Sequence, residues 1–201
     1  MAEFKTKEIT YFLRPGFNNT QKAIELAVKR AREGDIDKIV VATSSGNTGV
    51  AVVDAFKGTK ISVIPVILNA GSKYSSEDGE WTKNKSKYEK AGIKYVHGIH
   101  AFSGVERAVK TRWGTAGPLL IIADALRLSG EGTKVCVEIA IMATDSGFIT
   151  PDEKVLTIAG TGRGSDTVLL VKPAYSSNFF EFAIKEIICK PIVDGIKHDA
   201  K

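Results

Sequence analysis

The first part of the chain alternates helical and β-type patterns of apolar residues. A helix is predicted first, because apolar residues recur at helical spacing behind candidate N-cap residues, namely Ile24, Ala27, Val28 and Ala31 behind Asn18, Asn19 and Thr20. The continuous apolar run from Lys38 to Thr43 is typical of a buried parallel strand. A polar loop follows it, and the pattern turns helical again from about Gly49 to Phe56.

The next apolar run, Ile61 to Leu68, predicts a second strand. Pro65 within it cannot donate a ladder hydrogen bond, so we expect a strand end or a bulge there. A strand, a loop, a helix and a strand in this order predict a right-handed crossover and a parallel sheet with helices on its faces.

The remaining patterns extend the same architecture. Helices are predicted up to Ala91, at Val105 to Val109, from Pro118 to Leu126 and over the run Thr133 to Met142, and a short strand is predicted at Ile93 to Val96. The run Thr133 to Met142 is apolar almost all round, which indicates a buried helix.

Two strands, Lys154 to Gly160 and Asp166 to Pro173, are joined by a loop short enough for a hairpin, so the sheet is mixed. Phe180 to Pro191 predicts an edge strand, and residues 1–201 are expected to form a single α/β domain.

Composition narrows the expected partners. With 43% hydrophobic and 25% charged residues the chain has the make-up of a soluble globular protein. A net charge of +5 is compatible with nucleic acid, with an anionic small ligand or with neither. The densest basic stretch, Thr82 to Lys90, contains one aromatic residue and is interpreted as a solvated helix face, so no nucleic acid partner is predicted.

The cysteines and the apolar runs bear on three further classes of protein, namely zinc-binding, secreted and membrane proteins. The two cysteines, Cys136 and Cys189, have no Cys-x-x-Cys spacing, so neither a zinc site nor a disulfide framework is predicted. The first residues lack the apolar core of a signal peptide, and no run approaches the ~18 residues of a membrane span. We therefore expect a cytoplasmic protein without a membrane partner, and the sequence leaves homo-oligomer formation open.

The loop after the first parallel strand is the leading candidate for ligand binding. It reads "VATSSGNTGVA" from Val41 to Ala51. A strand, a hydroxyl-rich turn and a helix start place several N–H and O–H donors where one phosphate could accept them. The candidate residues are Thr43, Ser44, Ser45, Gly46, Asn47 and Thr48. The alternative is a strand-to-helix turn in which Ser or Asn only caps the helix.

A second candidate lies in the predicted hairpin, "AGTGRGSD" from Ala159 to Asp166. A strand follows it where the dinucleotide fingerprint requires a helix, so the Rossmann interpretation fails. Its glycines allow a close approach of the backbone to a ligand, and Arg163 adds a planar donor suited to phosphate. The candidates are Thr161, Gly162, Arg163 and Gly164, and the alternative is a flexible hairpin tip.

Two histidines follow the short strand predicted at Ile93 to Val96. His97 and His100 could begin a metal site, but no third ligand with an evident spacing appears, so no metal is predicted. A pocket-lining role is expected instead, with Ser103 and Gly104 beside His100.

Two family resemblances bear on the hydroxyl-rich loop. Ser45 to Gly49, "SGNTG", is similar to the loop with which pyridoxal-phosphate enzymes of amino-acid metabolism hold the substrate carboxylate. Those enzymes carry a Schiff-base lysine in a Ser-x-Lys-x-Arg context about thirty residues earlier, and "LRPGFNNTQK" offers no such motif. A pyridoxal-phosphate lyase is therefore kept as an alternative on that loop alone.

The motifs "TSSGNTG", "ISVIPVI" and "TGRGSDTVLLV" resemble, in the same order, the C-terminal α/β domain of pyruvate kinase over about Asp37 to Lys172. The chain looks most like small stand-alone prokaryotic proteins related to that domain. The resemblance implies a three-layer α/β/α fold with a mixed sheet. No catalytic barrel is present, so no pyruvate kinase activity is expected.

That stand-alone family is associated with bound FMN, so the resemblance implies an FMN site. It assigns the loop residues Thr43 to Thr48 to the phosphate and Thr161 to Gly164 to a second wall. We expect His100, Ser103 and Gly104 at the ring or the ribityl chain. The predicted function is binding of FMN, a small-molecule phosphate ester, with flavin-dependent redox chemistry left open. The alternative to an FMN protein is a regulatory module that senses a phosphorylated metabolite.

Overall fold

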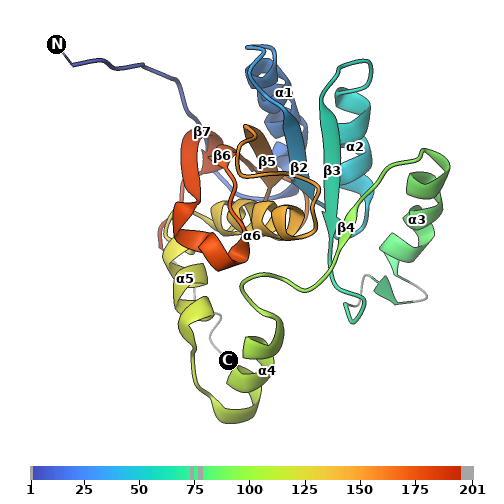
Figure 1. Cartoon of the computed structure of the whole chain (residues 1–201), viewed down its shortest axis with the longest axis vertical. Coiled ribbons are helices and arrows are strands. Elements are labelled where there is room, and N and C mark those ends of the chain that lie inside the picture. The colour runs from blue at the N-terminus through green and yellow to red at the C-terminus, as the bar shows by residue number, and fades with distance from the viewer. Residues whose placement is uncertain (1, 73–74, 77–78, 196–201) are drawn as a thin grey trace.

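A mixed sheet forms the centre of the computed structural model, which describes residues 2–72, 75–76 and 79–195 (Figure 1). The sheet has seven strands in the order β1-β7-β6-β5-β2-β3-β4. The strands are β1 (Thr10–Phe12), β2 (Lys38–Ala42), β3 (Ser62–Ile67), β4 (Val96–His97), β5 (Val155–Ala159), β6 (Thr167–Lys172) and β7 (Ala183–Pro191). The helices are α1 (Thr20–Ala31), α2 (Asn47–Ala55), α3 (Glu80–Lys90), α4 (Gly104–Trp113), α5 (Pro118–Arg127) and α6 (Glu131–Asp145), with 3-10 turns η1 (Phe17–Asn19) and η3 (Ser176–Glu181).

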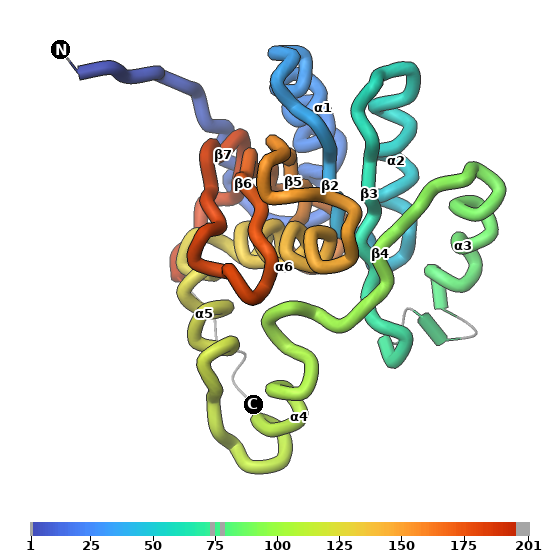
Figure 2. The backbone as a smooth tube through the Cα atoms, in the orientation of Figure 1, coloured from blue at the N-terminus to red at the C-terminus, as the bar shows by residue number. Residues whose placement is uncertain are grey.

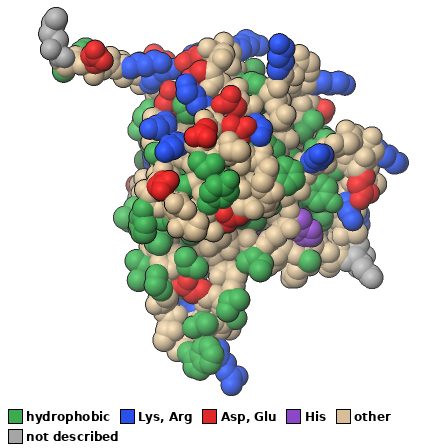
Figure 3. Space-filling model, viewed as in Figure 1, with side chains coloured by type: hydrophobic (Ala, Val, Ile, Leu, Met, Phe, Trp, Pro, Cys, Tyr) green, Lys and Arg blue, Asp and Glu red, His purple; other side chains and the backbone are tan. Residues whose placement is uncertain are grey.

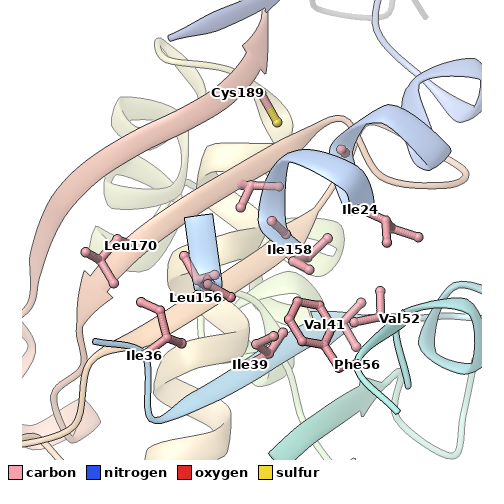
Figure 4. Close-up of a cluster of buried hydrophobic side chains, with 14 residues drawn as sticks. Ile24, Ile36, Ile39, Val41, Val52, Phe56, Leu156, Ile158, Leu170 and Cys189 are labelled. Atoms are coloured by element: carbon pink, nitrogen blue, oxygen red, sulfur yellow. The ribbon is translucent and has the colours of Figure 1, made fainter. Parts of the chain in front are cut away.

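Helices α1 and α2 cover one face of the sheet. Alternate residues of a strand point to opposite faces, so Ile39 and Val41 of β2 and Leu156 and Ile158 of β5 share this side. They pack with Ala23, Ile24 and Ala27 of α1 and with Val52 and Phe56 at α2 (Figure 4). The period of 3.6 that predicts the first helix is therefore the period of its buried stripe.

Helix α6 covers the other face, where Val40, Val155 and Leu169 meet Cys136 and Ala140. The prediction of a buried helix here is confirmed, and with it the three-layer α/β/α fold. Two charged residues of this run, Lys134 and Glu138, are buried together with the apolar ones. The hairpin is confirmed too, since β5 and β6 pair antiparallel while β2 pairs with β3 and β5 in parallel.

The predicted edge strand at Phe180 to Pro191 is corrected in two respects. The 3-10 turn η3 occupies its first residues, so the strand begins at Ala183. The strand is also interior to the sheet, because β1 pairs with it in parallel and forms the edge. β1 is a strand of 3 residues that was not predicted.

Two smaller corrections concern the strands on the other side of the sheet. β3 runs through Pro65 without an end or a bulge. The Val66 carbonyl oxygen accepts the Thr43 N–H on the β2 side, so the backbone of Pro65, which has no N–H, faces the β4 side. There β4 pairs only with Val66 and Ile67. β4 also begins later than predicted, because Ile93 and Tyr95 pack on Trp81 and Tyr88 of α3 instead.

Helices α4 and α5 extend away from the sheet as an arm (Figures 1 and 2). No residue of α4 is buried, and of α5 only Ala123 is. The space-filling view shows apolar and basic side chains over this arm (Figure 3). None of the helices in the described ranges combines the length and the hydrophobicity that a membrane span needs.

Candidate functional site

A cleft of about 560 Å³ opens at the carboxyl ends of β2, β3 and β5. The chain leaves β2 toward β3 on one side and β5 toward β6 on the other, so the loops at these strand ends diverge. Open α/β sheets bind ligands at such a point, and the size is that of a small-molecule pocket. The hydroxyl-rich loop, the hairpin loop and α6 are walls of the same cleft.

The loop between β2 and α2 has a fixed shape of its own. Gly46, the N-cap of α2, has φ +88°, a left-handed conformation that favours glycine. Thr43 is buried and its Oγ1 accepts the Gly49 N–H at 3.2 Å, while Ser45 Oγ accepts the Asn47 N–H at 3.4 Å. For the Thr48 N–H no acceptor is found among the described residues. The turn therefore leaves a helix N–H at the cleft while its own hydroxyls hold the backbone.

Helix α3 supports this loop from behind. Asn84 Nδ2 donates to the Ser45 carbonyl oxygen at 2.7 Å and to Asn47 Oδ1 at 3.0 Å. The Tyr88 hydroxyl donates to the Gly46 carbonyl oxygen at 2.5 Å, and burial raises the pKa of Tyr88 to about 12, which keeps it a neutral donor. Sequence reasoning assigned neither residue to the site. Their spacing, i and i+4 on a predicted helix, indicates a shared face but not what that face contacts.

The hairpin wall is held by a buried carboxylate. Asp166 Oδ2 accepts the N–H groups of Gly16 at 2.9 Å and Thr161 at 3.2 Å, and Oδ1 accepts the Thr167 hydroxyl. Gly164 packs so closely on Thr20 and Phe17 that a Cβ would overlap the Thr20 hydroxyl. These contacts tie the base of the loop to the segment from Gly16 to Thr20.

Arg163 and Glu80 face each other at the cleft, with Arg163 Nη2 at 3.9 Å from Glu80 Oε1. The Arg163 side chain is 72% exposed and Glu80 48%. An exposed pair at this separation is weak. The guanidinium is therefore available to an anionic ligand.

The third wall was not predicted. It carries charged side chains from the helices after β4, namely Arg107, Arg127, Glu131, Lys134 and Glu138. Arg127 is engaged by Glu131, with Nε at 2.5 Å from Oε2, and by Asp124 at 2.7 Å. Arg107 forms no ion pair with another residue of the described ranges.

Glu138 is the most deeply buried member of this wall. It is 1% exposed, and its carboxylate is met by Lys134 Nζ at 2.5 Å, His100 Nδ1 at 3.2 Å and the Phe102 N–H at 3.1 Å. Burial alone raises the pKa of a carboxyl. The hydrogen bond from His100 and the charge of Lys134 outweigh it and lower the pKa of Glu138 to about 2. The group is therefore ionised at neutral pH.

This ionisation predicts a specific acid sensitivity. Because the pKa of Glu138 falls from its ordinary 4.5 to about 2 on folding, its contribution to stability is present above pH 4.5 and is lost as the pH falls toward 2. Urea unfolding across this range should show a steeper loss for the native protein than for Glu138→Gln. The exposed Glu89→Gln serves as the control, expected to keep the native slope. Equal slopes in the native protein and Glu138→Gln would contradict the ionised state.

The cleft brings together most of the predicted site residues. Its lining includes Thr43, Ser44, Ser45, Asn47, Thr48, His100, Gly162, Arg163 and Gly164. Gly46 lies beneath the loop against α3, and Thr161 turns its N–H to Asp166. Ser103 and Gly104 line a neighbouring cavity of about 390 Å³, which shares His100 with the cleft. His97 is exposed and lines neither cavity.

That the protein binds no metal stays a prediction. Within residues 2–72, 75–76 and 79–195, no three His, Cys, Asp or Glu side chains gather in a way that could hold an ion. The predicted solvated lysine face is observed, since α3 buries Trp81, Asn84 and Tyr88 and exposes Lys83, Lys85, Lys87 and Lys90.

A family comparison agrees with this architecture. The model of the pyruvate kinase alpha/beta domain matches residues 21–171, which is more than half of the 201 residues. The match runs from α1 to β6 and so includes both loops of the cleft. The chain belongs to the pyruvate kinase alpha/beta domain family.

Proposed function

We propose that the cleft binds a phosphate ester and that FMN is the ligand. The observation that carries the proposal is the turn at Ser44 to Thr48, which presents to the cleft its hydroxyls and the Thr48 N–H, a helix donor without an acceptor among the described residues. A helix N-terminus with free donors attracts an anion through its dipole and its N–H groups. Arg163 lines the same cleft. The family match covers this region but carries no ligand.

The residues present fit both parts of FMN. The polar loop and Arg163 suit the phosphate, and an apolar floor made by Val66, Leu68, Val135, Ile139 and Met142 suits a flat ring system. A flavin bound there would supply one- and two-electron redox chemistry. The chain itself would bind and orient it: the loop would fix the phosphate, and the apolar floor would exclude water from the ring.

The alternatives differ in what they require of the same cleft. A pyridoxal-phosphate enzyme needs a lysine amine free to form a Schiff base. Among the described residues the lysine that lines the cleft is Lys134, and its tight ion pair with Glu138 favours the charged, non-nucleophilic amine. A module that senses a phosphorylated metabolite would use the same loop, so it differs from the FMN proposal only in the rest of the ligand.

Single substitutions in the loop test the proposal. Ser45→Ala and Thr48→Ala should each weaken FMN binding by about 1–3 kcal/mol, because each removes a hydrogen bond to a charged group. Quenching of flavin fluorescence during titration with protein measures the affinity. Ser62→Ala, which removes an exposed hydroxyl at the start of β3, is the matched control and should bind as the native protein does. Unchanged affinity in the Ser45→Ala/Thr48→Ala double variant would contradict a phosphate at this loop.

A further inference from the structure

His100 stands between two cavities. It lines the large cleft and the neighbouring cavity of about 390 Å³, and its side chain is 27% exposed. One ring nitrogen, Nδ1, lies 3.2 Å from Glu138 Oε2. The other polar atom of the ring, Nε2, has no partner among the described residues.

The state of Glu138 decides which ring nitrogen carries the proton. An ionised carboxylate only accepts hydrogen bonds. Lys134 Nζ and the Phe102 N–H already donate to it, and both are fixed by α6 and by the turn before α4. The contact with His100 therefore requires a proton on Nδ1, which leaves Nε2 of the neutral ring as an acceptor.

Lys134 is the cation that pairs with this buried carboxylate, since its Nζ lies 2.5 Å from Glu138 Oε2. The other charged groups that line the two cavities are Arg107, Arg127, Glu131, Glu80 and Arg163 in the cleft, and Glu106 and Asp145 in its neighbour.

We propose that His100, oriented by Glu138, presents Nε2 to the ligand as a hydrogen-bond acceptor, so that the site selects phosphate esters with an N–H or O–H donor beyond the phosphate. His100 touches the ligand, and Glu138 is a positioning residue. A ligand without such a donor would leave Nε2 desolvated and unpaired, which costs binding free energy. FMN carries donors of both kinds, on its ring and on its ribityl chain. The inference rests on the proposed function for the identity of the cleft as the ligand site.

Nitrogen NMR of the imidazole rings tests the orientation without any ligand. In the ¹⁵N-labelled native protein, at a pH where histidine is neutral, His100 should show the Nδ1–H tautomer alone. Glu138→Gln should lose this preference, because an amide can donate as well as accept. The exposed His97 is the internal control and should show a mixture in both proteins. A native His100 with its proton on Nε2, or with mixed tautomers, would overturn the proposal.

Addition of FMN to the same sample tests the ligand contact. The Nε2 resonance of His100 should shift to lower frequency while that of His97 stays. His100→Phe should lose FMN affinity about tenfold, the scale of one hydrogen bond, and His97→Phe should lose none. If FMN fluorescence is quenched on binding but the Nε2 resonance does not shift, the proposed contact between His100 and the ligand is wrong. FMN that does not bind refutes the proposed function, and the tautomer of His100 still decides whether Glu138 orients the ring.

Discussion

Replacing Lys134 with methionine is expected to lower the free energy of unfolding by about 3–5 kcal/mol, because it leaves the buried Glu138 carboxylate without its cation. Lys134 and Glu138 are 6% and 1% exposed, and the pair is 2.5 Å apart. Methionine keeps the length and most of the volume of the lysine side chain, so the loss reports on the charge. Urea unfolding at neutral pH measures it.

An exposed pair with the same spacing is the control. Lys85 and Glu89 are also i and i+4 on a helix, but their side chains are 49% and 57% exposed. Lys85→Met should change the stability by about 0.5 kcal/mol or less. The double variant Lys134→Met/Glu138→Met should be more stable than Lys134→Met, because it removes the unpaired charge. A Lys134→Met protein as stable as the native one would contradict a charged pair in this position.

Gly49→Ala is expected to destabilise the protein by about 3 kcal/mol and to abolish tight FMN binding, because it overpacks the interface of α2 and α3 and displaces the Tyr88 hydroxyl. A Cβ at Gly49 would overlap Tyr88 Oη and lie 3.0 Å from Thr43 Cγ2. Tyr88 Oη is the donor that holds the Gly46 carbonyl oxygen. Thermal unfolding and FMN titration measure the two effects.

Tyr88→Phe separates the clash from the lost hydrogen bond. Alone it should cost about 1 kcal/mol, because the Gly46 carbonyl oxygen loses its donor. In the Gly49→Ala background it should instead restore stability, since it removes the atom that the new methyl group overlaps. Gly71→Ala, where a Cβ meets nothing within 4 Å, is the control. Additive losses from Gly49→Ala and Tyr88→Phe would show that the two residues do not meet.

Local pattern predicts most of the layers but not the edge of the sheet. The stripe of α1 has the period of its buried face, and β2, β5 and β6 are continuous apolar runs that are buried on both faces of the sheet, so these elements are visible in the sequence. β1 has 3 residues and no such period, and it pairs with a strand far away in the chain. Because of that long-range pairing, the predicted edge strand β7 is an interior one.

The candidate site also has a part that the sequence predicts and a part that it does not. Each of the two loops is one continuous motif at the end of a strand, so it could be recognised in the sequence. Because β2 and β5 are parallel, their carboxyl ends bring both loops to the same edge of the sheet. The wall of α4 to α6 has no such local signal. Lys134 and Glu138 lie within an apolar run, and the partner that gives them a function, His100, comes from another segment. Tyr88 and Asn84 could likewise not be assigned to the site, because the sequence of a helix face does not show which loop the helix contacts.

The central claim is that the loop at Ser44 to Thr48 holds the phosphate of a bound ester, and a comparison of FMN with riboflavin tests it most directly. The two flavins differ only in the phosphate, so the ratio of their dissociation constants isolates it. The native protein should bind FMN at least about tenfold more tightly than riboflavin, the scale of one charge-assisted hydrogen bond. In Ser45→Ala/Thr48→Ala most of this ratio should disappear. Equal affinities of the native protein for FMN and riboflavin would contradict the claim.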